Sequence, residues 1–326
     1  MGSANSSSAK VFPPVRHKLR KNRWDKDDSQ LALLTLPTTV WYILFCYLPM
    51  FGALIAFKDF RIRGGGFIAS FINSAWVGLD NFKFLFMSND MALIIRNTLA
   101  YNIVFLILGV VLPVTLAIII SELRNKFLAK VYQTMMFFPY FLSWVVVSAI
   151  VLGFLSTDKG MFNSLRESFG LPPYFFYMEK KFWPPFLIFM SQWKGLGFGM
   201  VVYLAAITGL DKTYFEAAII DGATKTQQIR YITLPLIKKI IILMFILSVG
   251  GLFRSDFGLF YLLPRNSGAL FDVTYTIDVY IYRLLTGTAT TGMASAAALL
   301  QSVICCIMIL SANWIVRKVD NESAMI

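Results

Sequence analysis

Charged residues are scarce in this chain of 326 residues: Asp, Glu, Lys and Arg make up 15% of it, against about 25% in ordinary soluble domains. The only histidine is His17, which excludes a histidine-based metal site or a Ser-His-Asp triad within the chain. The three cysteines, Cys46, Cys305 and Cys306, lie in apolar runs without metal-ligand spacing. We therefore expect no metal site, and we interpret the cysteines as reduced packing residues.

Long apolar runs take the place of charge, since 57% of the residues are hydrophobic. A helix that crosses a bilayer needs about 20 mostly apolar residues, whereas soluble helices average about 11–12 residues with one apolar stripe. The sequence predicts an all-α integral membrane protein with six transmembrane helices in one domain, 31–318, between tails at 1–30 and 319–326. The expected spans are 31–57, 97–121, 131–157, 182–210, 240–253 extended through Arg254 and Asp256, and 293–314.

The basic residues predict how the spans are oriented. Six spans place both termini on one side, and the N-terminal tail and the loops on that side are denser in Lys and Arg than the opposite loops. The positive-inside rule then predicts a multi-pass membrane protein with both termini in the cytoplasm. Because orientation in a bilayer accounts for the net charge of +12, we expect no nucleic-acid partner.

The predicted cytoplasmic segment 211–236, between the fourth and fifth spans, has the pattern of a helix, a glycine break and a second helix. Asp211 is placed to cap the first helix, Gly222 interrupts it, and Pro235 is expected to open the fifth span. Small residues on one face suit docking to another protein, while an amphipathic interface helix without a partner fits the pattern as well. The pattern alone leaves both interpretations open.

Within this segment, Glu216-Ala217-Ala218, followed by Gly222 and then by Ile232 and Leu234-Pro235, resembles the EAA loop of binding-protein-dependent ABC importer permeases. The resemblance implies a type I importer permease fold in which 211–236 forms a coupling helix seated on an ATPase. The residues that it assigns to this contact are Glu216, Ala217, Ala218, Asp221, Gly222 and Ala223.

The resemblance extends over nearly the whole chain beyond the N-terminal tail. The segments 276–283 (TIDVYIYR) and 312–318 (ANWIVRK) look like the carbohydrate-uptake subfamily of polysaccharide permeases that includes the LplB type and the alginate importer. It implies a bacterial inner-membrane location, a second, homologous permease subunit in a heterodimer, two ATPase subunits and an extracytoplasmic solute-binding protein. The chain has no glycine loop ending in Gly-Lys-Ser/Thr, so ATP and Mg²⁺ are expected on the partner ATPase and no cofactor on this chain.

Three charged residues fall at membrane depth, where ionisable groups are costly and usually face a cavity or a partner. Lys194 in the fourth span and Arg254 and Asp256 near the fifth are predicted to lie in the outer half. Either Lys194 or Arg254 faces the sugar path and attracts an acidic group, or Lys194 pairs with Asp256 or extends outward. In either case Arg254 favours a uronate-like substrate such as alginate. The full set predicted along the path is Gln192, Trp193, Lys194, Arg254, Asp256 and Gln301, with Trp144 as a further candidate for stacking on a sugar.

Two other classes of function stay open. A polytopic transferase needs a carboxylate cluster at a membrane face, whereas the acidic residues here are dispersed, without an Asp-x-Asp pair in the predicted external loops. A secondary transporter working alone predicts inverted repeats and broken helices in matching positions. Six spans and a docking segment favour the importer permease over both alternatives.

Overall fold

The computed structural model describes residues 26–61, 66–88, 90–287 and 290–319. The predicted tails at 1–30 and 319–326 therefore lie almost wholly outside the described residues. In the described part, the regular elements are helices, with one isolated β-bridge between Lys58 and Trp76. The chain divides into two compact units, residues 1–51 and 52–326, and each is described by itself.

The described part of the first unit is one long apolar helix. It consists of α1 (Lys26–Tyr42), a π-helical turn η1 (Ile43–Tyr47), α2 (Leu48–Met50) and the first residue of η2 (Phe51–Phe57). Its apolar side chains are exposed within the chain; the exposed fraction of Leu34 is 76%. Because the apolar residues surround this helix on all sides, its surroundings in the cell must be lipid or other membrane helices.

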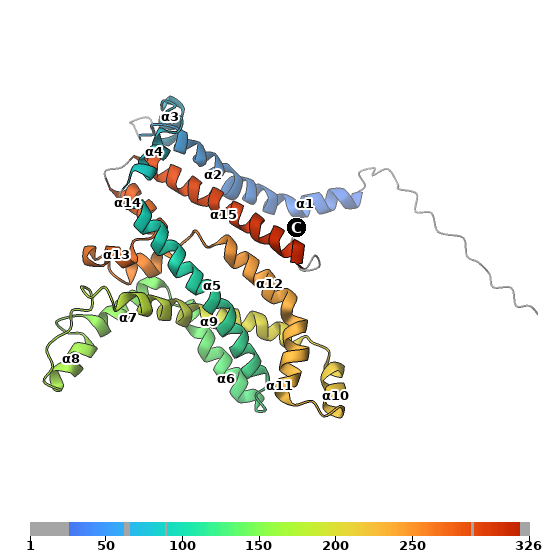
Figure 1. Cartoon of the computed structure of the whole chain (residues 1–326). Helices are drawn as coiled ribbons and strands as arrows, with labels where there is room; N and C mark the ends of the chain where they lie inside the picture. Colours follow the sequence, from blue (N-terminus) through green and yellow to red (C-terminus); the bar gives the residue numbers. More distant parts are fainter. Residues whose placement is uncertain (1–25, 62–65, 89, 288–289, 320–326) are drawn as a thin grey trace, which may run out of the picture. The chain divides into compact units, whose positions relative to one another are not determined.

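The second unit contains the other membrane-crossing helices (Figure 1). Here α5 (Met91–Ser121) packs most extensively against α9 (Trp183–Thr208), and α12 (Leu234–Gly250) lies beside α15 (Thr291–Val319). In the described residues five helices are long and apolar enough to cross a membrane. A sixth crossing is bent by 97° between α6 (Lys126–Phe137) with η3 (Phe138–Phe141) and α7 (Trp144–Leu155). The predicted all-helical six-span class is confirmed, with its third span broken.

Proline sets the local form of several helices. Three five-residue π-helical turns in the described residues, η1, η4 (Ile229–Thr233) and η5 (Gly258–Leu262), are each followed directly by Leu-Pro. Proline lacks an N–H and its ring meets the carbonyl four residues earlier, and widening the preceding turn relieves both problems. The prediction that Pro235 opens the fifth span is wrong, because one helix runs through it from Lys225 to Gly250.

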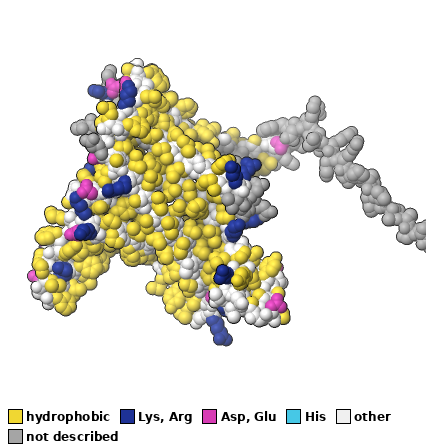
Figure 2. All heavy atoms as spheres, viewed as in Figure 1, with side chains coloured by type: hydrophobic (Ala, Val, Ile, Leu, Met, Phe, Trp, Pro, Cys, Tyr) yellow, Lys and Arg dark blue, Asp and Glu magenta, His cyan; other side chains and the backbone are white. Residues whose placement is uncertain are grey.

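Short helices cover the ends of the spans. They are α3 (Gly66–Asn73), α4 (Asp80–Met87), α8 (Met161–Ser168), α10 (Lys212–Ile220), α11 (Lys225–Gln228), η6 (Gly268–Leu270), α13 (Phe271–Thr274) and α14 (Ile277–Thr286). One buried cluster centres on Trp183, Leu259 and Phe260, and another on Met200 and Tyr203. Outside these clusters hydrophobic side chains dominate the visible surface (Figure 2), as expected for a chain that faces lipid.

Candidate functional site

The segment 211–236 begins with a capped helix. Asp211 is the N-cap of α10, and its Oδ1 accepts a hydrogen bond from the backbone N–H of Thr213 at 3.0 Å. This bond holds the pKa of the Asp211 carboxyl below its ordinary value. The predicted cap is confirmed, and it fixes where the chain turns from α9 into α10.

A tight turn joins α10 to α11. Gly222 has a φ of +78°, a left-handed conformation that glycine adopts without strain. Its N–H donates to the Ile219 carbonyl at 3.0 Å, and the Ala223 N–H donates to the Ala218 carbonyl at 2.8 Å. These two bonds form a Schellman motif, which closes the C-terminus of α10. The predicted glycine break is therefore a defined turn.

The next helix starts with a capping box. The Thr224 side chain accepts from the Gln227 N–H at 3.4 Å, and the Thr224 N–H donates to the Gln227 side chain at 2.7 Å. From Lys225 the helix continues without interruption to Gly250. The turn after α10 is thus connected directly to a 26-residue helix that reaches the opposite end of the span.

The structure brings the predicted EAA residues together at this turn. Glu216 and Ala217 are exposed on α10, and Ile220 beside them is 85% exposed. The other four predicted residues line one cavity of about 320 Å³ together with side chains of the following helix. These four are Ala218, Asp221, Gly222 and Ala223. An exposed isoleucine beside small residues and a carboxylate is suited to contact with another protein.

Among the residues predicted along the substrate path, Lys194 lies at the break in the third span. Its Nζ donates to the backbone carbonyl of Tyr140 at 3.0 Å. The ammonium lies 5.5 Å from the ring centroids of Tyr140 and Trp144. Lys194 therefore satisfies a carbonyl at the break, and its charge is stabilised by two aromatic rings.

Asp256 reaches the same tryptophan from the stretch that follows α12. Its Oδ2 accepts from Trp144 Nε1 at 2.7 Å, and its Oδ1 accepts from the Gly258 N–H at 2.9 Å. The described residues show no ion pair between Lys194 and Asp256; both contact Trp144 instead. Trp144 packs so closely that a Cβ on Gly258 would lie 2.1 Å from its Cδ1 atom. We call Trp144, Lys194, Asp256 and Gly258 the Trp144 junction.

Arg254 and Asp256 do not extend the fifth helix, which corrects the predicted boundary. The helix ends at Gly250, and the Gly250-Gly251 pair is followed by a non-helical stretch that carries both charges. Asn102 of α5 holds this stretch by donating to the Arg254 carbonyl at 2.6 Å. The Arg254 side chain is exposed and forms no ion pair with the described residues.

Gln301 lies in a buried network behind this stretch. Its Nε2 donates to the Phe253 carbonyl at 3.1 Å and to Asp278 Oδ2 at 3.0 Å. The same carboxylate oxygen accepts from the Ser255 N–H at 2.5 Å and from the Ser255 hydroxyl at 3.0 Å. Gln301 therefore supports residues 253–255. Sequence reasoning missed Asp278 and Ser255, although Asp278 lay in the segment 276–283 that carried the resemblance.

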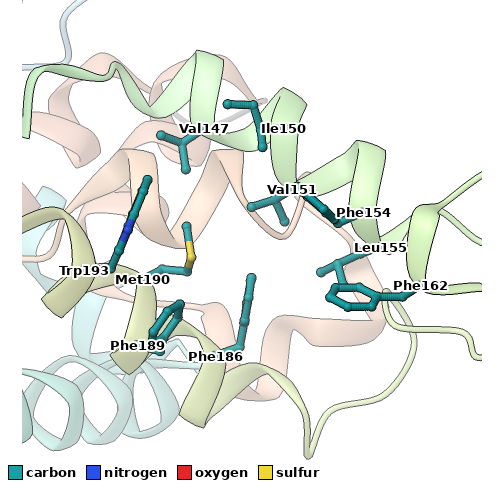
Figure 3. Close-up of a pocket in the computed structure, with 10 residues that line it drawn as sticks. All are labelled: Val147, Ile150, Val151, Phe154, Leu155, Phe162, Phe186, Phe189, Met190 and Trp193. Atoms are coloured by element: carbon teal, nitrogen blue, oxygen red, sulfur yellow. The ribbon is translucent and has the colours of Figure 1, made fainter. Parts of the chain in front are cut away.

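The two residues before Lys194 have different surroundings. Trp193 lines an apolar cavity of about 270 Å³ between α7, α8 and α9 (Figure 3). The cavity offers apolar side chains rather than hydrogen-bonding groups for a sugar. Gln192 is half-buried in α9, and its side chain makes no hydrogen bond to the described residues. Their predicted contact with substrate stays a prediction, as does that of Gln301.

No group of three or more His, Cys, Asp and Glu in the described part of the chain could hold a metal ion. The Trp144 junction instead offers an indole ring, a carboxylate and one cation, Lys194, and a second cation, Arg254, lies two residues from Asp256. Aromatic faces stack on sugar rings and guanidinium groups bind carboxylates, so this arrangement is suited to a polar, acidic ligand rather than to a covalent reaction.

Comparison with known proteins identifies relatives over most of the chain. Residues 109–321 match the family described as binding-protein-dependent transport system inner membrane component. The protein LplB of Bacillus subtilis (strain 168) is 34% identical over 297 residues, which cover 91% of each chain. The polygalacturonan/rhamnogalacturonan transport system permease protein YteP of the same organism is 32% identical and covers 90% of this chain and 89% of its own.

Solved structures give the same result. A chain in the crystal structure of a bacterial ABC transporter involved in the import of the acidic polysaccharide alginate matches with a TM-score of 0.79 and 32% identity. The match covers 90% of this chain and 97% of that chain. A second structure, of a bacterial alginate ABC transporter in complex with an alginate pentasaccharide-bound periplasmic protein, matches with a TM-score of 0.78.

Proposed function

Because the chain belongs to the family of binding-protein-dependent transport system inner membrane components, we propose that it imports an acidic oligosaccharide, such as an oligouronate of the alginate type. The general function, without the choice of substrate, is that of a permease subunit of a sugar or oligosaccharide ABC importer in the inner membrane. It is a transporter subunit rather than an enzyme, and a separate partner carries the ATPase.

The exposed cation Arg254 beside the Trp144 junction is the observation that carries the choice of substrate. A charged group near the membrane interior is costly, and it is usually retained where it meets a ligand or a partner. Arg254 forms no ion pair with the described residues, whereas Asp256 is hydrogen-bonded to Trp144. A passing uronate carboxylate would give the guanidinium a partner, and the aromatic rings would stack on the sugar faces.

The relatives support the same choice. The names of two of them refer to acidic polysaccharides: alginate for the solved transporter, and polygalacturonan and rhamnogalacturonan for YteP. Each of these polymers carries carboxylates along the chain. A neutral oligosaccharide remains the competing substrate class, and it would leave Arg254 without a ligand group of opposite charge.

The proposed coupling path is the helix from Lys225 to Gly250. One end follows the turn at Gly222, and the other ends just before Arg254 and Asp256. At 1.5 Å per residue its 26 residues span about 39 Å. An ATPase that moves α10 would therefore also move the non-helical stretch at the substrate path, because a single helix connects the two. Such a movement provides alternating access.

The proposed assembly follows the importer architecture. It contains this chain, a second, homologous permease subunit, two ATPase subunits that bind ATP and Mg²⁺, and an external solute-binding protein. Both termini lie in the cytoplasm, on the side of the segment 211–236. The Lys and Arg residues in the tail and in the loops on that side support this orientation.

The substrate proposal is tested with the complete importer in proteoliposomes. Substrate-loaded binding protein is supplied with either an oligouronate or a neutral oligosaccharide of equal length, and uptake is measured for Arg254→Gln. We expect oligouronate uptake to fall by about tenfold, the value of one charge-assisted hydrogen bond, while any neutral uptake is unchanged.

The control is Lys159→Gln, which removes an exposed cation from the external loop before α8. It should leave uptake unchanged. Equal losses for acidic and neutral sugars in Arg254→Gln would show that the guanidinium does not recognise a carboxylate. Faster transport of the neutral sugar by the wild-type importer would make it the substrate class.

A further inference from the structure

A third cavity lies at the end of the bundle where α10 and α11 begin. Its volume is about 770 Å³, and the ends of α5 and α9, the start of α6 and the faces of α10 and α11 line it. The residues at the span ends that line it are Ser121 and Thr208, so it lies where the apolar spans stop. In a bilayer this is the level of the lipid headgroups.

The cavity is strongly basic. Arg124, Lys126, Lys212 and Lys225 line it, and Glu122 is its only acidic lining residue. Glu122 Oε2 pairs with Lys225 Nζ at 3.0 Å. The other three cations form no ion pair with the described residues, which leaves the cavity a net charge of +3. Figure 2 shows basic side chains at this end of the molecule.

The uncharged lining is partly apolar and partly polar, and one buried polar atom in it lacks a partner. Ile207 and Leu210 extend the apolar surface of α9 into the cavity, and Phe215 and Ile219 of α10 face it. Gln228 also lines the cavity and is 3% exposed. Its Nε2 donates to the Ala223 carbonyl at 3.1 Å, whereas its Oε1 accepts no hydrogen bond from the described residues. A ligand that combines an anion, a hydroxyl donor and methylene groups would match all three features.

We propose that this cavity binds the phosphodiester headgroup of an anionic membrane lipid. Arg124, Lys126 and Lys212 contact the phosphate, and the first methylene groups of the lipid lie against Ile207 and Leu210. A headgroup hydroxyl, such as that of phosphatidylglycerol, donates to the buried oxygen of Gln228. Basic pockets between helix ends are suited to this ligand class because the phosphate charge replaces the missing counter-ions.

The position of the site links the lipid to coupling. Arg124 lies between α5 and α6 and Lys126 is the first residue of α6, whereas Lys212 is the first residue of α10. A phosphate held by all three therefore joins α10 to the neighbouring span ends. This consequence rests on the proposed function, since it requires that an ATPase act on α10. Lipid binding itself does not require it.

The test uses the complete importer in nanodiscs made from phosphatidylcholine with increasing fractions of phosphatidylglycerol. Native mass spectrometry counts the phosphatidylglycerol molecules that stay bound to the importer after detergent washing. The combined variant Arg124→Gln, Lys126→Gln, Lys212→Gln should bind phosphatidylglycerol at this site about 100-fold more weakly, because each basic residue near an anionic surface contributes about fivefold.

Two further variants make the result specific. The charge-retaining variant Arg124→Lys, Lys212→Arg should keep the bound lipid, which separates loss of charge from loss of fold. Lys130→Gln with Arg230→Gln removes two exposed cations near the same end that do not line the cavity, and it should also keep the lipid. Equal lipid retention in the triple variant and the wild type would overturn the proposal.

Other occupants give different results. Displacement of the bound lipid by inorganic phosphate or glycerol phosphate at similar concentration would make this a free phosphate site. Loss of the ATPase subunits from the triple variant in pure phosphatidylcholine would make it a protein contact. Failure of the proposed function has another signature, because an importer that does not transport oligouronates would still retain phosphatidylglycerol in the wild type and lose it in the triple variant.

Discussion

The segment 211–236 and the Trp144 junction differ in the sequence distance that their hydrogen bonds cover. In the segment, Asp211, Gly222 and Thr224 are held by partners no more than five positions away. At the junction, Trp144 and Asp256 are 112 positions apart, and Lys194 and Tyr140 are 54 apart. The coupling turn can therefore keep its form when α10 moves, whereas the junction exists only while the third and fourth spans stay packed against residues 256–258, which follow α12.

The largest expected effect comes from breaking the junction at its tightest contact. Gly258→Ala places a Cβ 2.1 Å from Trp144 Cδ1, so the indole must move away from Asp256. Overpacking costs about 1–3 kcal/mol and the lost charge-assisted hydrogen bond about 1.5–3 kcal/mol. We expect uptake in proteoliposomes to fall about 100-fold, while the ATPase subunits still co-purify.

The matched control for this variant is Gly153→Ala in α7, where an added Cβ has no atom within 4 Å. Its uptake should equal that of the wild type. If Gly258→Ala transports normally, the Trp144 junction is not needed in the transport cycle. Loss of the ATPase subunits in Gly258→Ala would instead show that the junction and the segment 211–236 depend on each other.

The second-largest effect is expected from breaking the buried hydrogen-bond network of Asp278, Ser255 and Gln301. Asp278→Asn replaces a carboxylate that accepts three hydrogen bonds from Ser255 and Gln301 through one oxygen. Hydrogen bonds to charged groups contribute about 1.5–3 kcal/mol, so we expect transport efficiency to fall by about tenfold or more. Kinetics of substrate-stimulated ATP hydrolysis should show the loss mainly in the apparent affinity for loaded binding protein. The reason is that Asp278 and Gln301 bind Phe253 and Ser255, the two neighbours of Arg254, and so hold Arg254 in place.

A double-mutant cycle identifies the network as the cause. Gln301→Ala alone should cause a similar loss, and the combination with Asp278→Asn should cost much less than the sum of the two. Asp272→Asn is the control, since this exposed carboxylate pairs with Lys180 rather than with the buried network. Fully additive losses would mean that Asp278 and Gln301 act separately.

The contrast in sequence distance also explains what could be predicted. The cap at Asp211 and the break at Gly222 follow from residue types and their near neighbours, and the structure confirms both. The six apolar runs likewise predict six spans from length alone. The prediction for Pro235 was wrong because the π-helical turn at Ile229–Thr233 lets the helix continue through the proline. This turn depends on backbone geometry, which residue type does not specify.

The Trp144 junction could not be assembled in this way. Hydropathy placed Lys194 and Asp256 at similar depth, but depth does not say which side chain lies between them. Trp144 fills that position because the third span breaks between Phe141 and Trp144 and because Gly258 leaves room for the indole. Asp278 was missed for a related reason: its partners Ser255 and Gln301 lie on separate elements, and no spacing along the chain relates them.

A smaller effect is expected from a change within the segment 211–236. Thr224→Ala removes the capping box of α11, and the loss of such an N-cap costs about 1 kcal/mol. We expect a loss of less than about fivefold in the ratio of substrate transported to ATP hydrolysed, with unchanged binding of loaded binding protein. Thr224→Ser should behave as wild type because serine supplies the same cap. A defect in substrate binding would contradict the separation between the two regions.

The smallest effect is a dependence on pH that is confined to the start of α10. The hydrogen bond from the Thr213 N–H lowers the pKa of Asp211 in the folded protein, so its contribution to stability is complete above the ordinary value of 3.8. It is lost as the pH falls through the lowered pKa, because protonation removes the charged acceptor. Hydrogen exchange at the first amides of α10 should therefore show weaker protection only in this acidic range. Asp211→Asn caps the helix without titrating, so its protection should not change with pH there, and an identical decrease in both proteins would assign the effect to another group.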